Sequence, residues 1–512
     1  SVAAFDCGPG VTLATVIGAL GCMLTGFSYV KLSQAIPSTG GVYAYAYHSL
    51  GEAFAVISAA CLTLDYAISG SAVAASWGSK FALAVGVDVL GSFQVGPVGV
   101  NLAAILVCVP CIAVLLQGVD MSKKVSNIVF LVMFALVVFI ISCAMLLFKV
   151  SNLTPLVPTR TQVDGEGRYG IDGVFTGTVN CFFAFVGFNE VCCLAGESKN
   201  PKQDMPRAVV LSIVVLAFFT FSAGLGMVGM QHYTEIDPDD GFVVGLKSHN
   251  WQTAAWIVSI GELLTLPLVV FISFLPQARL FYAMGMDGLL PQIFTRVNSQ
   301  GVLLQSNLII GACGTVLAMV MKFDDLDEMI SAGILSCFII CNCSLIMLTL
   351  DVDGGSTTGE ATPTTGHVRR RAGTFLAVYC ASCFGCAVLV ESLLLYPTLF
   401  GWLSLEPFAV KTPIIVMAIL FAMLAAASLW QLCRQHHDEQ LGPIWLPAAA
   451  ILFNCTMLSS LDHSGFFTIG GYFACVFVLY VGCMTGQSAS VHDEWMAGSS
   501  LLRQHSPTNG GA

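Results

Sequence analysis

The sequence predicts an all-α protein that crosses a membrane many times. Of its 512 residues, 56% are hydrophobic and only 10% are charged, whereas a soluble domain has roughly one charged residue in four. The mean hydropathy is +0.82. Apolar runs near the roughly 20 residues that a helix needs to cross hydrocarbon recur along the chain. The net charge of −11 is spread over loops and tail, which argues against nucleic acid as a partner.

Thirteen apolar runs, bounded by polar, glycine or proline residues, predict the membrane helices. In chain order we expect these helices at residues 11–32, 51–78, 98–117, 125–148, 172–194, 207–230, 251–284, 302–321, 326–350, 374–396, 412–433, 444–460 and 465–486. Most of the 20 cysteines lie inside such runs, and we interpret them as packing residues rather than disulfides or metal ligands.

The distribution of lysine and arginine sets the orientation. With the loop after the first helix in the cytoplasm, 13 of the 20 basic residues fall on the cytoplasmic side and 7 on the other, as the positive-inside rule requires. This orientation makes the polar segment 351–373 and the tail 487–512 cytoplasmic. Both are expected to lack regular structure.

Residues 183–191, FAFVGFNEV, interrupt an apolar run with a glycine, an asparagine and a glutamate. Gly187 lowers helix propensity by about 1 kcal/mol, and a loosened helix in lipid is tolerated only where it is buried or lines a cavity. Freed carbonyls at such a break can take an ammonium group or a cation. A close helix contact at Gly187 is the alternative. Glu190 favours the interpretation of the break as a binding site over a close helix contact. An ionisable group at this depth costs a few kcal/mol unless it is paired, neutralised or hydrated.

Three other acids are expected at similar depth: Asp65, Glu262 and Glu391. For each one alone, a protonated or locally hydrogen-bonded carboxyl within the helix packing is a competing interpretation. Almost no lysine or arginine lies in the apolar runs to pair with them. As a group, they therefore favour a positively charged ligand, protons, or both.

Three segments of the chain carry specific sequence motifs. Residues 26–52 contain a P-x-x-G-G-x-Y-x-Y signature, and residues 182–210 resemble an interrupted sixth helix with its following loop. Residues 276–291, PQARLFYAMGMDGLLP, are similar to the end of the eighth helix. The motif residues of the second and third segments are Glu197, Asn200, Pro201, Pro206, Arg279, Ala283, Met284, Asp287, Gly288 and Pro291. Together, these segments resemble the amino acid/polyamine/organocation (APC) transporters. The helix count, fourteen once a first helix before Ser1 is added, resembles the eukaryotic cationic amino acid transporter family in particular.

This resemblance implies a five-plus-five inverted repeat with extra C-terminal helices, and a first helix that would precede Ser1. Residues 1–350 would form the transporter core, helices 2 to 10 of the family pattern. Residues 351–373 would be a cytoplasmic linker, 374–486 four additional transmembrane helices, and 487–512 a cytoplasmic tail. The implied function is amino acid transport by alternating access, as a uniporter or exchanger, with no enzymatic activity, cofactor or metal.

The resemblance also implies the substrate site. The substrate ammonium would meet carbonyls of helix 6, while its carboxylate would meet a break in the first helix, which this sequence does not contain. Carriers of arginine and lysine tend to have glutamate where Asp65 stands and often aspartate where Asn189 stands. Some bacterial relatives have a proton-linked lysine where Met133 stands. The candidate substrate-binding residues are Asp65, Phe183, Ala184, Phe185, Val186, Asn189 and Glu190.

A cationic amino acid such as arginine, lysine or ornithine is therefore the expected substrate. Neutral amino acids or polyamines are the alternative substrates, and a non-transporting amino acid sensor with the same fold is the alternative function. The expected partners are the substrate and the lipid bilayer. The expected location is the plasma membrane, with a vacuolar or lysosomal membrane as the alternative.

Overall fold

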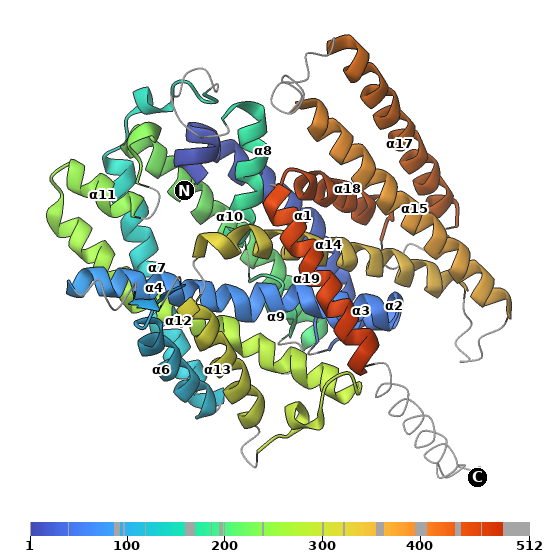
Figure 1. The fold of residues 1–512 in the computed structure, drawn as a ribbon, viewed down its shortest axis with the longest axis horizontal. Coiled ribbons are helices and arrows are strands. Elements are labelled where there is room, and N and C mark those ends of the chain that lie inside the picture. Colours follow the sequence, from blue (N-terminus) through green and yellow to red (C-terminus); the bar gives the residue numbers. More distant parts are fainter. Residues whose placement is uncertain are drawn as a thin grey trace.

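The computed structural model is helical almost throughout (Figure 1). The residues it describes are 2–38, 40–86, 93–95, 98–117, 119–158, 169–185, 187–193, 198, 200–237, 240–298, 302–320, 323–354, 363–394, 407–435, 442–461 and 463–484. The predicted all-α class is confirmed except for one small hairpin, in which β1 (Phe93–Val95) pairs antiparallel with β2 (Val98–Val100). Valines flanking a Gly-Pro pair favour this local exception.

Each of the thirteen predicted spans coincides with helical structure. The first half of the chain contains α1 (Val11–Ala35), α2 (Val42–Ser49), α3 (Glu52–Thr63), α4 (Ser69–Val85), α6 (Ala104–Leu116), α7 (Val119–Leu146), α8 (Gly170–Cys181) and α9 (Glu190–Cys193). The second half contains α10 (Pro201–Met230), α11 (Gly241–Ser248), α12 (Gln252–Met286), α13 (Leu304–Val320), α14 (Phe323–Gly354), α15 (Pro363–Leu394), α17 (Pro407–Gln435), α18 (Trp445–Ser459) and α19 (His463–Leu479).

Length and composition mark most of these helices as membrane-spanning. Within the described residues, 8 helices are long and apolar enough to cross a membrane. Four shorter apolar helices lie at Ala104–Leu116, Leu304–Val320, Trp445–Ser459 and Thr468–Gly482. The remaining predicted span, 172–194, is the interrupted helix formed by α8 and α9. The protein is thus an integral multi-pass membrane protein.

Helices of the two predicted repeats pack against their counterparts. In chain order, α1 contacts α10, α4 contacts α12, and α6 contacts α13. This arrangement places helices of the first half of the predicted core against helices of its second half. It agrees with the predicted five-plus-five inverted repeat.

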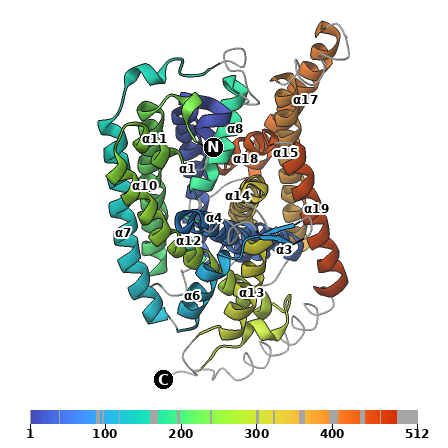
Figure 2. The same cartoon turned by 60° about the vertical axis from the view of Figure 1, so that its left-hand side comes forward.

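Burial separates a central helix from peripheral ones. In the most apolar stretch of α14, 78% of residues are buried, against 11% in α7, α10 and α17. Accordingly, α7 and α10 lie along the left side in Figure 2, while α14 lies near the centre, between them and α15. The outer faces of α7 and α17 expose large apolar side chains, including Leu131 and Leu420. Lipid, rather than water, is the solvent that such faces require.

The polar segment 351–373 is more regular than the sequence predicts. Helix α14 continues to Gly354 and α15 already begins at Pro363, so the expectation of an irregular linker is wrong for residues 351–354 and 363–373. Proline is favoured in the first turn of a helix, and the Arg369–Ala372 run that follows has good helix propensity. Residues 355–362 and the predicted tail lie outside the described residues.

The described cysteines form no disulfide with one another, and most are buried among the helices. The Sγ atoms of Cys343 and Cys380 lie 3.5 Å apart, as thiols in hydrogen-bond contact. These cysteines therefore act as small packing residues, as predicted.

Candidate functional site

The interrupted helix predicted at FAFVGFNEV is present. Helix α8 ends at Cys181, a 3-10 turn covers Phe182–Phe185, and α9 begins at Glu190. Between them, Gly187 has a φ of +113°, a conformation that side-chain-bearing residues rarely adopt. Within the described structure, nothing lies within 4 Å of the position that a Cβ of Gly187 would occupy. No close helix contact at Gly187 is therefore present among the described residues, contrary to the alternative interpretation.

A second irregular segment surrounds Asp65. Between α3 and α4, residues Leu64–Ile68 form a π-helical turn within an otherwise continuous helix. The Ser69 hydroxyl donates to the Asp65 carbonyl oxygen. The Asp65 side chain is only 2% exposed. Wide turns of this kind re-aim side chains and are frequent at functional sites.

Asn189 joins the two irregular segments. Its Nδ2 atom donates to Asp65 Oδ2 at 2.5 Å, and its Oδ1 atom accepts from the Gly187 N–H at 3.3 Å. The other carboxyl oxygen, Asp65 Oδ1, is buried and has no hydrogen-bond partner among the described residues. A carboxylate oxygen can accept further hydrogen bonds, so Oδ1 can accept one from a donor outside the described residues.

Glu190 adds a second buried carboxyl beside the break. It begins α9, is 9% exposed and interacts electrostatically with Asp65. The ion pairs within the described residues all involve Lys80 and include neither of these acids. Nor does any group of three His, Cys, Asp or Glu side chains that could hold a metal ion occur in that part of the chain.

Aromatic side chains pack around the broken segment. The ring of Phe188 lies 5.5 Å from Tyr29 of α1 and 5.4 Å from Phe338 of α14, measured between ring centroids. All three rings are buried. Such rings keep lipid away from the exposed peptide groups, and their faces can attract a cation.

The predicted site residues divide into three groups. Asp65 and Asn189 touch, and Glu190 lies next to them. Phe185 is buried and faces Gly18 of α1, whereas Ala184 is exposed in the 3-10 turn. Val186 and the side chain of Phe183 lie outside the described residues. The carbonyl roles of Phe183, Ala184 and Val186 stay predictions.

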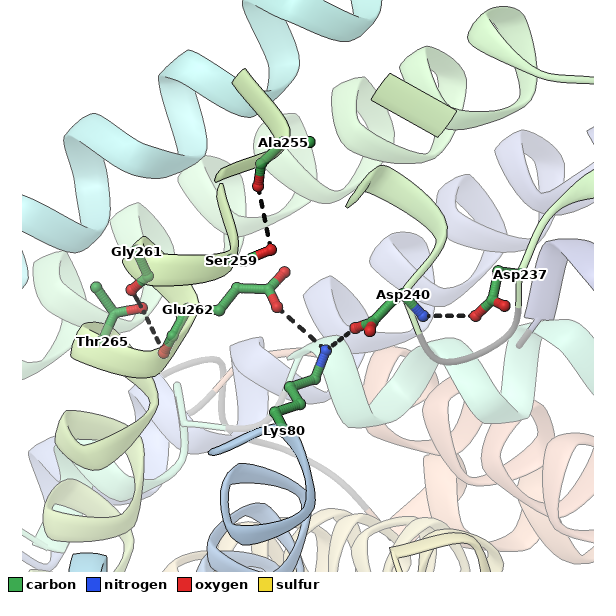
Figure 3. Close-up of polar contacts among 8 residues, drawn as sticks. All are labelled: Lys80, Asp237, Asp240, Ala255, Ser259, Gly261, Glu262 and Thr265. Carbon is green, nitrogen blue, oxygen red and sulfur yellow. Dashed lines mark hydrogen bonds and ion pairs between the residues drawn. The ribbon is translucent and has the colours of Figure 1, made fainter. Parts of the chain in front are cut away.

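Glu262 has a basic partner that its own apolar run does not reveal. In Figure 3, Lys80 of α4 points between Asp240, which precedes α11, and Glu262 of α12. The Nζ–Oε2 distance to Glu262 is 3.1 Å. The expectation that Glu262 lacks such a partner is wrong, because the packing of α4 against α12 brings together residues far apart in sequence. Glu391, by contrast, accepts a hydrogen bond from Ser460 at 3.3 Å, as a packed carboxyl should.

The three motif segments meet at one end of the molecule. Tyr43 of the first motif donates to Asp287 of the third at 2.6 Å, and Gln34 Nε2 donates to the Lys202 carbonyl of the second at 3.2 Å. Burial raises the pKa of Asp287 above its ordinary range, while the hydrogen bond from Tyr43 partly lowers it. Burial and the Asp287 charge raise the pKa of the Tyr43 hydroxyl, which keeps it protonated as the donor. Glu197 of the second motif lies outside the described residues.

Comparison with known proteins agrees with these motifs. The chain is 31% identical over 363 residues to "Cationic amino acid transporter 3, mitochondrial" of Arabidopsis thaliana, which covers 68% of the chain and 58% of that protein. It is 28% identical over 494 residues to "Cationic amino acid transporter 1" of the same plant, covering 93% and 76%. It is also 28% identical over 359 residues to "Branched-chain amino acid permease BcaP" of Bacillus subtilis, covering 67% and 75%.

These relatives are named as transporters, in agreement with the prediction that the chain is not an enzyme. The chain spans somewhat more than half the length of the first of them, at 58%. The family model described as "Amino acid permease" matches residues 2–424. That match contains both irregular segments and all three motifs. The chain belongs to the amino acid permease family.

Proposed function

We propose that this protein carries cationic amino acids across a membrane by alternating access, as a uniporter or exchanger. The observation that supports this proposal most is the buried pair Asp65–Asn189 at the broken helix, with Glu190 beside it. A buried carboxylate is costly unless a positive partner compensates it. An ammonium or guanidinium group of the substrate would be that partner. Relatives named as cationic amino acid transporters add support.

Each site residue has a distinct role in this proposal. Carbonyl oxygens of Phe183, Ala184 and Val186 would accept hydrogen bonds from the substrate α-ammonium group. Asp65 Oδ1 would accept from the cationic side chain, while Asn189 holds the opposite carboxyl oxygen in place. Glu190 would place a second buried carboxyl group beside Asp65. The loosened backbone at Gly187 would allow α8 and α9 to change their relative angle during transport.

Uptake of labelled arginine by the full-length protein in proteoliposomes tests the proposal. Wild-type uptake should be saturable, and Asp65→Asn should reduce it at least about tenfold, the effect of losing about 1.4 kcal/mol of binding. Glu235→Gln is the matched control, because it removes a carboxylate from an exposed position outside the site. Asp65→Asn transport at the wild-type rate would refute the role of the Asp65 charge.

Neutral amino acids are the second candidate substrates, because Asn189 carries no charge and one relative is named as a branched-chain amino acid permease. Competition by leucine and by putrescine against labelled arginine separates the neutral, polyamine and cationic possibilities. A sensor is the remaining alternative. Saturable arginine binding without uptake or exchange in the same proteoliposomes would favour the sensor over the carrier.

We propose the plasma membrane as the location, as the family resemblance implies. Relatives whose names include vacuolar and mitochondrial provide the alternatives. Imaging of a fluorescently tagged full-length protein against markers of these membranes distinguishes the three.

A further inference from the structure

A second candidate binding site lies between α15 and α17. These helices pack side by side in Figures 1 and 2, outside the predicted five-plus-five core. A cavity of about 370 Å³ opens between them, lined by Arg371, Thr374 and Phe375 of α15 and by Gln431 of α17. It involves none of the residues assigned to the amino acid site.

The cavity lies where the two helices leave the apolar part of the membrane. The membrane-spanning stretch of α15 begins at Arg370, and that of α17 ends at Arg434. Because the cavity is lined by residues near both of these ends, the start of one span lies beside the end of the other. The boundary between hydrocarbon and headgroups is therefore at the level of this cavity.

Positively charged residues lie in the cavity and close to it in sequence: Arg371 lines it, and Arg370 and Arg434 lie within three residues of lining residues. Arg370, Arg371 and Arg434 are all exposed. The Arg434 guanidinium lies 5.5 Å from the ring centroid of Trp430, which is itself 59% exposed. Tryptophan and arginine together at this depth are typical of a membrane interface. A negatively charged group would find complementary charge here.

An apolar surface continues from the cavity along α17 toward the centre of the membrane. Its exposed side chains one to four turns before Trp430 are Ile415, Val416, Met417, Ile419, Leu420, Met423 and Leu424. Acyl chains can lie against such a surface, whereas a free inorganic anion gains nothing from it. The combination of a charged cavity and an apolar flank fits an amphiphile.

We propose that this cavity binds the phosphate headgroup of an anionic phospholipid. The Arg371 guanidinium offers a planar pair of N–H donors to two phosphate oxygens, and the Gln431 amide offers another donor. Thr374 already donates its hydroxyl proton to the Arg370 carbonyl at 2.9 Å, so it contributes a wall rather than a donor. Phe375 covers the apolar glycerol region, and the acyl chains lie on α17. Basic clefts between membrane helices are suited to such headgroups.

The test uses the full chain in nanodiscs that contain equal amounts of phosphatidylglycerol and phosphatidylcholine. After gentle extraction into detergent, mass spectrometry measures the lipids that stay bound. The wild type should retain phosphatidylglycerol in preference to phosphatidylcholine. Arg371→Gln should weaken this retention about fivefold, the change expected for one cation near a lipid phosphate. Arg371→Lys, which keeps the charge, should retain more than Arg371→Gln.

Arg296→Gln is the matched control, because it removes an exposed arginine after α12, away from the cavity residues. It should leave the retention unchanged. Equal retention of the two lipids by the wild type, or wild-type retention by a folded Arg371→Gln variant, would overturn the proposal. A wash with excess inorganic phosphate separates the two phosphate sources. Displacement of phosphatidylglycerol by inorganic phosphate would identify a site for the free anion and would also overturn it.

Discussion

Two acidic clusters share the helix formed by α3 and α4 and compensate their charges in different ways. The helix formed by α3 and α4 carries Asp65 in its π-helical turn and Lys80 roughly 22 Å further along its axis. Asp65 meets only the neutral amide of Asn189 among the hydrogen-bond partners described for its carboxyl group. Around Lys80, by contrast, Asp240 and Glu262 share one ammonium group inside the protein.

This difference in charge compensation indicates two roles for buried or partly buried charge in this protein: stabilising helix packing and binding a ligand. The Lys80 cluster is compensated by the chain itself, so it stabilises the contact of α4 with α12 and with the segment before α11. The Asp65 pair leaves a carboxyl oxygen without a partner in the described structure, which reduces stability but keeps an acceptor for a ligand. Sites that bind ligands are often less stable than the surrounding structure for this reason.

The largest contrast is expected from Asp65→Asn and Glu262→Gln, measured as paired variants. Asp65→Asn should lower arginine uptake at least about tenfold, yet leave the melting temperature without arginine equal to or above that of the wild type, because a buried unpaired charge is removed. Glu262→Gln should lower the melting temperature and reduce uptake less. Thermal unfolding in detergent and uptake in proteoliposomes measure the two effects. A lower melting temperature for Asp65→Asn would contradict the distinction between the clusters.

A smaller effect is expected from the backbone at the break. Gly187→Ala should cost about 1–2 kcal/mol, because alanine is strained at a positive φ. Gly51→Ala is the matched control. Gly51 also has a positive φ, +102°, and open space around it in the described structure, but it precedes α3 away from the break. Both variants should lose similar stability, whereas only Gly187→Ala should lose arginine uptake as well. Equal uptake by the two variants would remove the functional role of the break.

The Lys80 cluster should respond to charge exchange. Lys80→Gln leaves two partly exposed carboxylates without their ammonium partner and should destabilise the protein by about 1 kcal/mol. Combining Lys80→Glu with Glu262→Lys should recover part of the stability that either change alone removes. A double-mutant cycle of melting temperatures measures this interaction. Purely additive effects would show that the pair does not stabilise the contact of α4 with α12.

The smallest loss of stability is expected from removing the hydrogen bond between the Tyr43 hydroxyl and Asp287, which joins the first and third motif segments. It serves as a reference for the other variants. Tyr43→Phe removes the hydroxyl that donates to Asp287 and should cost about 1 kcal/mol or less. Tyr47→Phe is a control on the same short helix, since Tyr47 is less buried than Tyr43. Thermal unfolding compares them. A Tyr43→Phe loss larger than that of Lys80→Gln would reverse the order of importance of the two contacts.

The sequence predicts the helices better than it predicts their polar contacts. An apolar run long enough for a membrane helix is visible directly, so all thirteen spans coincide with helices. The glycine and polar residues of FAFVGFNEV likewise predict a break, because the glycine has lower helix propensity than the apolar residues of the run and the polar residues interrupt its hydropathy. The π-helical turn at Leu64–Ile68 has no such local signal, since its residues are ordinary for a membrane helix.

Long-range contacts explain the remaining differences. The Lys80–Glu262 pair depends on the packing of α4 against α12, which hydropathy does not reveal. The link between Asn189 and Asp65 joins residues 124 positions apart, and only the family resemblance suggested that they share a site. Both ends of segment 351–373 are helical despite their polar composition, because polar composition does not exclude residues of good helix propensity.

The amide of Asn189 connects the first repeat of the chain to the second at a depth where both are irregular. A solute whose side chain competes for the Asp65 carboxylate would therefore also loosen the attachment between the repeats. Under the proposed transport function, substrate recognition and movement of the two repeats would then depend on one shared contact, so a poorly matched solute would leave both repeats in place.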